Sequence, residues 1–126
     1  MASREQISLK EKRILIVEDQ YLIAADLGRA LARLGGVIVG PVANAEAARA
    51  EMARVDIDLA FLDVNLDGQM VFPLADELER QGIPFIFATG HDATILPDRF
   101  KTKLRLAKPF TVQSVEEAVR QVNSSG

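Results

Sequence analysis

The sequence predicts an α/β fold in which helices cover both faces of a parallel sheet, and two observations support this prediction. Short apolar runs recur along the chain, and each is continuous, which is typical of a strand buried on both faces. Stretches with apolar residues at helical spacing lie between these runs, and such alternation favours right-handed βαβ units. The five runs are residues 14–17, 37–39, 59–62, 85–88 and 104–107. We therefore expect a three-layer sandwich, with a five-stranded parallel sheet and five helical segments.

The first half of the chain contains a leader, two strands and two helices. Residues 1–11 are mostly polar, and we expect them to form a flexible leader. A helix is predicted after the first apolar run by residues at helical spacing, which are Ile23, Leu27, Ala30, Leu31 and Leu34. Gly35 would end this helix. Asn44 can cap a second helix, which extends to about residue 54.

The second half begins with a clear helix and continues with a weak one. Asp67 and Gly68 mark a turn after the third apolar run, and a helix over residues 73–80 follows. The segment 90–103 has few apolar residues. Pro97 falls within it, where a helix interior would cost about 3 kcal/mol. We expect a short, late-starting or mobile helix there.

The closing helix is predicted over residues 111–122, and a capping-box pattern runs from Ser114 to Glu117. Apolar residues line one of its faces, and they are Val112, Val115, Ala118, Val119 and Val122. The elements use the whole stretch of residues 12–123, which is an ordinary length for one domain. We expect a single domain with no output domain.

The composition narrows the class of protein. The chain has 126 residues, 48% hydrophobic and 26% charged, which is ordinary for a globular domain. Its net charge of -3 argues against a nucleic-acid-binding surface. The absence of cysteine excludes disulfides and thiolate metal sites. No apolar stretch approaches the roughly 20 residues that span a bilayer, so we expect a cytoplasmic protein.

Polar side chains follow four of the five apolar runs. They are Glu18, Asp19, Asp63, Thr89 and Lys108. The carboxyl ends of parallel strands meet at one edge of a sheet, where ligands bind. Three carboxylates, a hydroxyl and an ammonium group would therefore converge there. This set of groups suits a divalent cation and a phosphoryl group.

Each of these groups has a chemical reason to be at such a site. A carboxylate such as Asp63 can act as a nucleophile and form an acyl phosphate. Magnesium takes oxygen ligands from one or two carboxylates, water and phosphate, and the backbone carbonyl of Asn65 could join them. Lys108 offers a compact positive charge, Thr89 offers a hydroxyl, and Pro109 could fix the chain after Lys108 through a cis bond.

The ordered set of Glu18, Asp19, Asp63, Thr89 and Lys108-Pro109 resembles the receiver domain of two-component response regulators, and the resemblance covers nearly the whole chain. It implies a flavodoxin-like fold with strand order 2-1-3-4-5. It implies that Asp63 accepts a phosphoryl group from a sensor histidine kinase or a histidine phosphotransfer protein, and that the domain is a signalling phosphoacceptor rather than an enzyme. Glu18, Asp19, Asp63 and the Asn65 carbonyl would hold Mg²⁺, and Thr89 and Lys108 would respond to the phosphoryl group.

A finer resemblance lies in residues 84–90, Pro-Phe-Ile-Phe-Ala-Thr-Gly. This stretch resembles the stand-alone receiver subfamily with the Phe-Ala-Thr-Gly signature, whose members often lack an output domain. The resemblance implies a single-domain response regulator in a phosphorelay. We expect a monomer or a weak dimer, with a downstream protein partner on the face between the fourth helical segment and the fifth strand.

Two positions depart from the family pattern. Receivers usually carry Tyr or Phe three residues before the lysine, as a rotating switch, and this position is Arg105 here. The subfamily usually has an aromatic residue after Thr-Gly, and this position is His91. The sequence therefore leaves open how phosphorylation is read out.

Three alternatives compete with the phosphoacceptor hypothesis. Asp63, Asn65, Asp67 and Gly68 match the first half of a calcium-binding loop, but Leu74 occupies the position that requires Glu. Aspartate-nucleophile phosphatases use a second Asp where this chain has Asn65. The alternative that stays open is a receiver-like interaction module that acts independently of phosphorylation.

Overall fold

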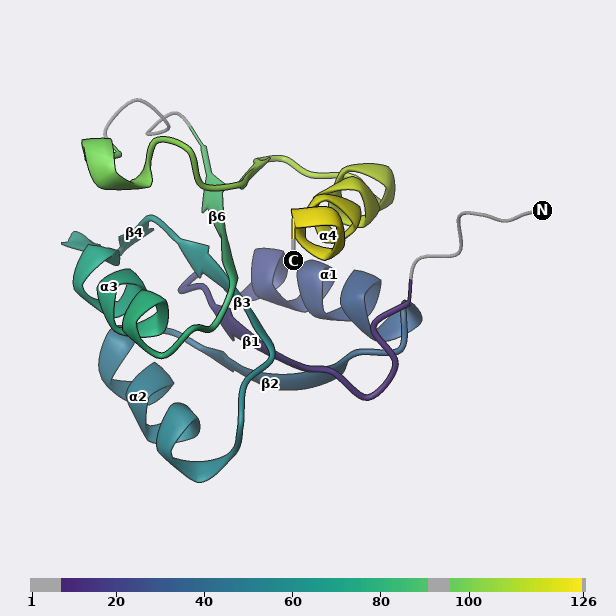
Figure 1. Cartoon of the computed structure of the whole chain (residues 1–126), viewed down its shortest axis with the longest axis horizontal. Coiled ribbons are helices and arrows are strands. Elements are labelled where there is room, and N and C mark those ends of the chain that lie inside the picture. The colour runs from purple at the N-terminus through teal and green to yellow at the C-terminus, as the bar shows by residue number, and fades with distance from the viewer. Residues whose placement is uncertain (1–7, 91–95, 126) are drawn as a thin grey trace.

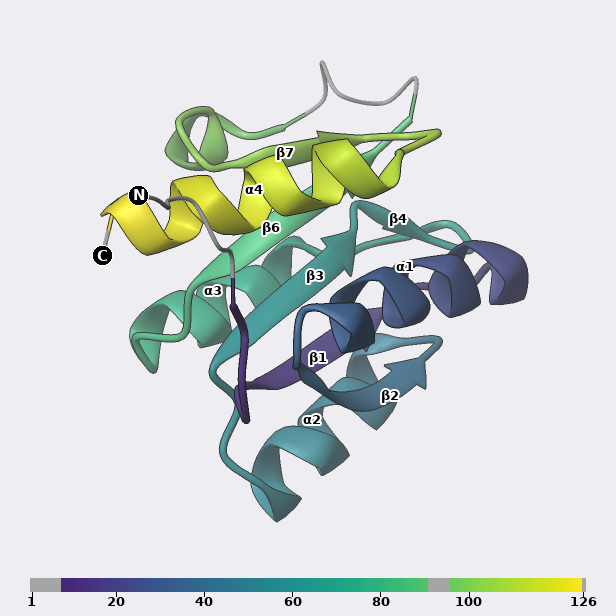
Figure 2. The ribbon, with the colours of Figure 1, turned by 90° about the vertical axis from the view of Figure 1, so that its right-hand side faces the viewer.

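The computed structural model describes residues 8–90 and 96–125 and has a central parallel sheet of five strands. The order β2-β1-β3-β6-β7 corresponds to the expected order 2-1-3-4-5 (Figures 1 and 2). The strands are β1 (Arg13–Val17), β2 (Val37–Val42), β3 (Leu59–Asp63), β6 (Phe85–Thr89) and β7 (Arg105–Ala107). The predicted fold class is confirmed, and β2 extends three residues beyond its apolar run.

Helices cover both faces of the sheet. Helices α1 (Tyr21–Arg33) and α4 (Val112–Ser125) pack on one face, and α2 (Ala45–Arg54) and α3 (Phe72–Arg80) pack on the other (Figure 2). Successive strand residues point to opposite faces. On β1, for example, Ile14 and Ile16 contact the α1 and α4 layer, while Leu15 and Val17 contact the α2 and α3 layer. Every strand residue from 14 to 17 is therefore buried.

The folded unit begins at Leu9, within the predicted leader. Residues 1–7 lie outside the described part of the chain. Leu9 is 3% exposed, and its N–H donates to the carbonyl of Leu34 at 2.7 Å. Glu11 N–H donates to the carbonyl of Gly35. Gly35 has a positive φ of 97° just after the end of α1, as expected for a glycine that ends a helix. Residues 9–11 are thus held against the end of α1.

Side-chain caps start two of the helices. Asn44 Oδ1 accepts from the N–H of Ala47 at 2.8 Å, as predicted for α2. The capping box predicted from Ser114 to Glu117 is wrong, because α4 already begins at Val112. The reciprocal pair is Thr111 and Ser114: Thr111 Oγ1 accepts from Ser114 N–H, and Ser114 Oγ accepts from Thr111 N–H. Ser114 therefore takes the place that Glu takes in the usual motif.

The fourth helical segment is short, as expected. In the part of 90–103 that the structure describes, the helix is a single 3-10 turn, η2 (Asp98–Phe100), and residues 91–95 lie outside that part. Pro97 stands directly before η2 with an extended ψ of 155°. A proline is tolerated there because the N–H that it lacks would have no helical partner. The described helices are therefore four α-helices and one 3-10 turn.

A small hairpin follows Asp63 that was predicted only as a turn. Strands β4 (Asn65–Leu66) and β5 (Gln69–Met70) pair antiparallel, with Asp67 and Gly68 between them. Both turn residues have positive φ, 53° and 92°, which is the geometry of a type I′ turn. Asn65 Oδ1 accepts from Gly68 N–H at 2.8 Å and closes this turn.

No helix among the described residues combines the length and apolar character needed to cross a membrane.

Candidate functional site

The predicted site residues lie together at the carboxyl edge of the sheet. Asp63 ends β3 and Thr89 ends β6, while Glu18 and Lys108 directly follow β1 and β7. These four strands are hydrogen-bonded neighbours in the order β1, β3, β6, β7. Parallel pairing therefore brings their carboxyl ends to one place, as the sequence predicted.

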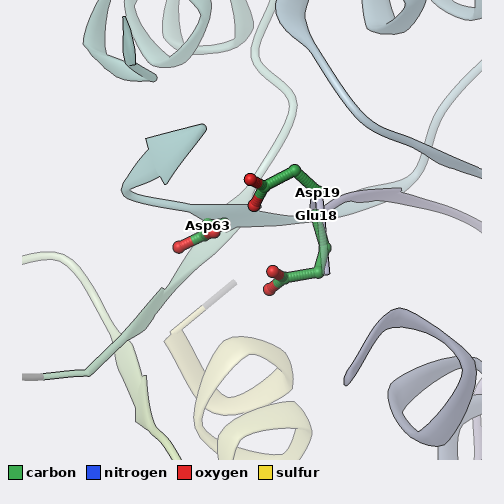
Figure 3. A group of neighbouring side chains, drawn as sticks. All are labelled: Glu18, Asp19 and Asp63. Carbon is green, nitrogen blue, oxygen red and sulfur yellow. The ribbon is translucent and has the colours of Figure 1, made fainter. Parts of the chain in front are cut away.

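Three carboxylates form the floor of this site. Glu18, Asp19 and Asp63 each offer an oxygen, and these oxygens lie within 4.8 Å of one another (Figure 3). Glu18 and Asp63 are buried, and Asp19 is half-buried. Three carboxylates this close repel one another unless cations offset their charge. Their oxygen donors fit a hard divalent cation such as Mg²⁺.

Lys108 supplies one of the compensating charges. Its Nζ lies 2.9 Å from Glu18 Oε1 and 3.3 Å from Asp63 Oδ1. Burial lowers the pKa of Lys108, but the hydrogen bond to Glu18 and the charges of Asp63 and Glu18 outweigh burial, so the pKa is raised. The backbone N–H of Lys108 donates to the carbonyl of Thr89 at 2.8 Å, and the Lys108–Pro109 bond is cis. The ammonium group is therefore charged and firmly placed.

The environment of Asp63 disfavours its ionised form. Burial, and then the negative charge of Glu18, raise the pKa of Asp63 to about 7, although Lys108 acts in the opposite direction. A cation bound beside Asp63 would lower this pKa and favour the carboxylate. Metal binding and the nucleophilic form of Asp63 are thus coupled.

Thr89 completes the set of predicted residues. It is 3% exposed and shares a face of β6 with Phe85 and Phe87. Its carbonyl accepts from Lys108 N–H, so the two residues are joined through the backbone. The register pairs Asp63 with Ala88, one residue before Thr89. Thr89 therefore lies beside the acidic group on the neighbouring strand.

A hollow of about 420 Å³ opens above these groups. Its lining residues are Asp19, Gln20, Asp63, Asn65, Asp67, Gly68, Gly90 and Lys108. Asp67 and Gly68 were not predicted as site residues, because the sequence indicated only a turn there. The Asp-Gly pair is a strong hairpin signal, and with two-residue strands on either side it could have revealed the hairpin that borders the hollow.

A second, more apolar hollow of about 370 Å³ adjoins the first. It lies between the start of α1 and the residues that follow Lys108, and Ile23 and Phe110 contribute to its lining. Beside it, Tyr21 and Leu22 are 81% and 74% exposed. Large apolar side chains exposed next to a polar site indicate a surface for a protein partner.

The two departures from the family pattern have different outcomes. His91 lies outside the described residues. Arg105 is exposed on β7, and its guanidinium donates to the carbonyl of Lys101 at 3.0 Å. Position 105 therefore has no aromatic side chain, but an aromatic cluster lies on the face of the sheet that α3 covers, the face that Thr89 shares. Its members are Phe72, Phe85, Phe87 and Phe100.

The chain is similar to known signalling proteins. It is 30% identical to the sensory transduction protein LytR of Staphylococcus haemolyticus over 115 residues, which cover 87% of this chain and 44% of LytR. It is 31% identical to the sensory transduction protein LytT of Bacillus subtilis over 113 residues, which cover 86% of this chain and 47% of LytT. The chain therefore spans less than half the length of the curated relatives that it matches.

Similarity to a solved structure covers nearly the whole of both chains. The solution structure of SdrG from Sphingomonas melonis Fr1 superposes with a TM-score of 0.81 at 39% identity, covering 90% of this chain and 97% of SdrG. The solution structure of the BeF3-activated conformation of SdrG gives a TM-score of 0.77 at 38% identity and covers 90% and 98%. The response regulator receiver domain matches residues 14–120. The chain therefore belongs to the receiver domain family of two-component response regulators, which are signalling domains.

Proposed function

We propose that Asp63 accepts a phosphoryl group from a phosphohistidine of a sensor kinase or a histidine phosphotransfer protein. The observation that carries this proposal is the placement of the Asp63 carboxylate, 3.3 Å from Lys108 Nζ and within 4.8 Å of two further carboxylates. An oxygen of Asp63 attacks phosphorus, an O–P bond forms, and the N–P bond of the phosphohistidine breaks. The imidazole nitrogen keeps the electron pair and takes up a proton.

The residues around Asp63 have separate tasks in this proposal. Glu18, Asp19, Asp63 and the backbone carbonyl of Asn65 hold Mg²⁺, and the ion supplies neutralisation of phosphoryl charge. Lys108 exchanges part of its contact with Asp63 for a phosphoryl oxygen. Thr89 donates its hydroxyl to another phosphoryl oxygen. Phosphoryl transfer depends mainly on such positioning and charge stabilisation.

A relative supports this assignment. The BeF3-activated conformation of SdrG has been solved, and it resembles this chain over 90% of its length at 38% identity. Residues 84–90 contain the sequence Phe-Ala-Thr-Gly, which further supports the proposal that this chain is a stand-alone receiver of the subfamily with that signature. We therefore expect the same mimic to bind beside Asp63 here.

The phosphodonor is a protein with an apolar contact surface. Tyr21 and Leu22 are strongly exposed, and Ile23 and Phe110 line the apolar hollow next to Lys108. A small phosphodonor would leave this surface uncovered, whereas a helix of a donor protein would bury it against the site. Downstream partners are proposed to bind the other side of the site, along η2 and β7, where Arg105 is exposed.

The first prediction tests this function. Incubation with acetyl phosphate and Mg²⁺ should add the mass of one phosphoryl group to the wild-type protein, as measured by intact-mass spectrometry. Removal of Mg²⁺ with a chelator should abolish the addition, and Asp63→Asn should not gain the mass. Asp56→Asn is a matched control, because it removes an exposed carboxylate near the opposite end of β3.

An unchanged wild-type mass with Mg²⁺ present would contradict the proposal. Partner binding that Asp63→Asn leaves unchanged would favour the alternative function, an interaction module that does not depend on phosphorylation.

A further inference from the structure

We propose that Asp67 makes the site selective among phosphodonors according to their charge: its carboxylate slows transfer from strongly anionic small donors relative to less anionic ones. This inference rests on the proposed function of Asp63 and adds a specificity-determining residue to that site. It arises from the placement of Asp67 in the turn of the β4–β5 hairpin, where it lines the same hollow as Asp63.

The hairpin fixes where Asp67 lies. The β4–β5 pairing continues directly from Asp63, and Val71 N–H donates to the carbonyl of Val64 at 2.9 Å to close its base. Asp67 has a φ of 53° in a turn that Asn65 Oδ1 holds through Gly68 N–H. The side chain of Asp67 is exposed and lines the same hollow as Asp63. The hairpin backbone therefore holds the charge of Asp67 beside the hollow.

The charges around the hollow are unbalanced in one respect. Among the described residues that line the hollow, Lys108 is the one cation, and it already lies within 3.3 Å of both Glu18 and Asp63. A bound divalent ion and Lys108 would together match the charges of Glu18, Asp19 and Asp63. Asp67 would then remain unmatched, because no ion pair joins it to a cation in the described part of the chain. An approaching anion is repelled by this unmatched charge.

Two small phosphodonors that transfer the same group but differ in net charge can distinguish repulsion by Asp67 from an effect on the transfer step itself. With acetyl phosphate, Asp63 forms an O–P bond while the P–O bond to acetate breaks, and acetate leaves with the electron pair. With phosphoramidate, the N–P bond breaks, and ammonia leaves from the already protonated nitrogen. Both transfer the same phosphoryl group to the same oxygen, but acetyl phosphate carries more net negative charge near neutral pH. Repulsion by Asp67 should act more strongly on acetyl phosphate.

The second prediction concerns Asp67→Asn. Asn suits a left-handed turn position, so the hairpin should persist. At saturating Mg²⁺ and low salt, phosphorylation by acetyl phosphate should become about threefold to fivefold faster, as expected for one charge interacting across solvent. Phosphorylation by phosphoramidate should change clearly less. Both effects should fade at 1 M salt, where the screening length is about 3 Å.

Ion binding gives an independent readout. Tyr21 is the one tyrosine in the chain and there is no tryptophan, so its fluorescence reports on ions bound beside Asp19. Removal of a nearby charge that is not a ligand should weaken Mg²⁺ binding by no more than about fivefold. Asp56→Asn is the control for loss of one negative charge, and it should alter neither the donor ratio nor Mg²⁺ affinity.

Three results would overturn the inference. The rate increase could be equal for both donors, or it could be matched by Asp56→Asn. Alternatively, Asp67→Asn could lower Mg²⁺ affinity by more than about tenfold and slow the reaction, which would make Asp67 a metal ligand. If the wild type gains no phosphoryl group from either donor, the proposed function fails together with this inference. An unchanged donor ratio in a protein that is phosphorylated removes the inference about Asp67 alone.

Discussion

Asp63 is placed where its ionised form is unfavourable for the fold. Its carboxyl group is buried, and Glu18 raises its pKa further, to about 7 from a value of 3.8. The folded state therefore binds a proton more tightly than the unfolded chain. By linkage, this group favours the folded state fully below its unfolded pKa, and the contribution is lost as pH rises through the folded pKa. A carboxylate at this position thus destabilises the domain near neutral pH.

The third prediction follows from this sign. Asp63→Asn should increase the free energy of unfolding at pH 8, because it removes a buried charge beside Glu18. The difference in free energy of unfolding between Asp63→Asn and the wild type should be larger at pH 8 than at pH 5, by about 2 kcal/mol. A one-unit pKa difference corresponds to about 1.4 kcal/mol. Urea unfolding with a chelator present measures both values. An advantage that is equal at the two pH values would show that burial of charge at Asp63 does not limit stability.

Among the elements, η2 has an unusual attachment. The guanidinium of Arg99 donates two hydrogen bonds to the carboxylate of Asp76 on α3, at 3.0 and 2.9 Å. Lys103 Nζ lies 2.8 Å from Glu79, also on α3. The Phe100 ring stacks on Phe72 with centroids 5.8 Å apart. A short 3-10 turn that forms few hydrogen bonds of its own is therefore held by α3.

The fourth prediction concerns the exchange of amide hydrogens in this element. Amides of residues 98–103 should exchange faster than those in the middle of α4, because a 3-10 turn contributes few internal hydrogen bonds. Arg99→Ala should increase exchange in this segment further by a few fold at most, as expected for an exposed ion pair that solvent screens. Hydrogen exchange measured by mass spectrometry or NMR resolves the two regions.

Arg54→Ala is the matched control, because Arg54 forms a comparable ion pair with Glu51 within α2. This variant should leave the hydrogen exchange of residues 98–103 unchanged. Equal protection of η2 and α4 would contradict the prediction.

The strands and the site were predictable from sequence because both depend on patterns within a few residues. Continuous apolar runs located the strands, and the polar residues after four of the five runs located the candidate site. The β4–β5 hairpin was missed because strands of two residues give no alternation to detect. The burial of Leu9 and the docking of Phe100 depend on contacts with distant residues, which local pattern does not contain. The cap at Thr111 was missed because Ser114 and Glu117 offered a competing motif three residues later.

At the scale of the whole molecule, the sheet separates two hydrophobic cores. One includes Leu27 of α1 and the other includes Leu78 of α3, and both side chains are at most 1% exposed. The central strands contribute to both cores, since their successive side chains alternate between the faces. Loss of packing on one face therefore weakens the strands that the other face needs.

The fifth prediction is that the two cores unfold together. Leu27→Ala and Leu78→Ala should each lower the free energy of unfolding by about 2–5 kcal/mol, the usual range for a buried leucine. Each variant should still show a single transition, with the same midpoint by circular dichroism and by NMR signals from both faces. Separate midpoints for the two faces would show that the sheet does not couple them.

The burial of Leu9 shows that the family match and the hydrophobic core begin at different residues. Similarity to the family begins at residue 14, at the first strand, whereas the hydrophobic core extends to Leu9. A fragment cut at the family boundary would keep every residue of the proposed phosphoacceptor site. It would nevertheless lose a core leucine and the hydrogen bonds that Leu9 and Glu11 donate to the end of α1. A fragment made for excision or fusion of this domain should therefore keep Leu9 and Glu11.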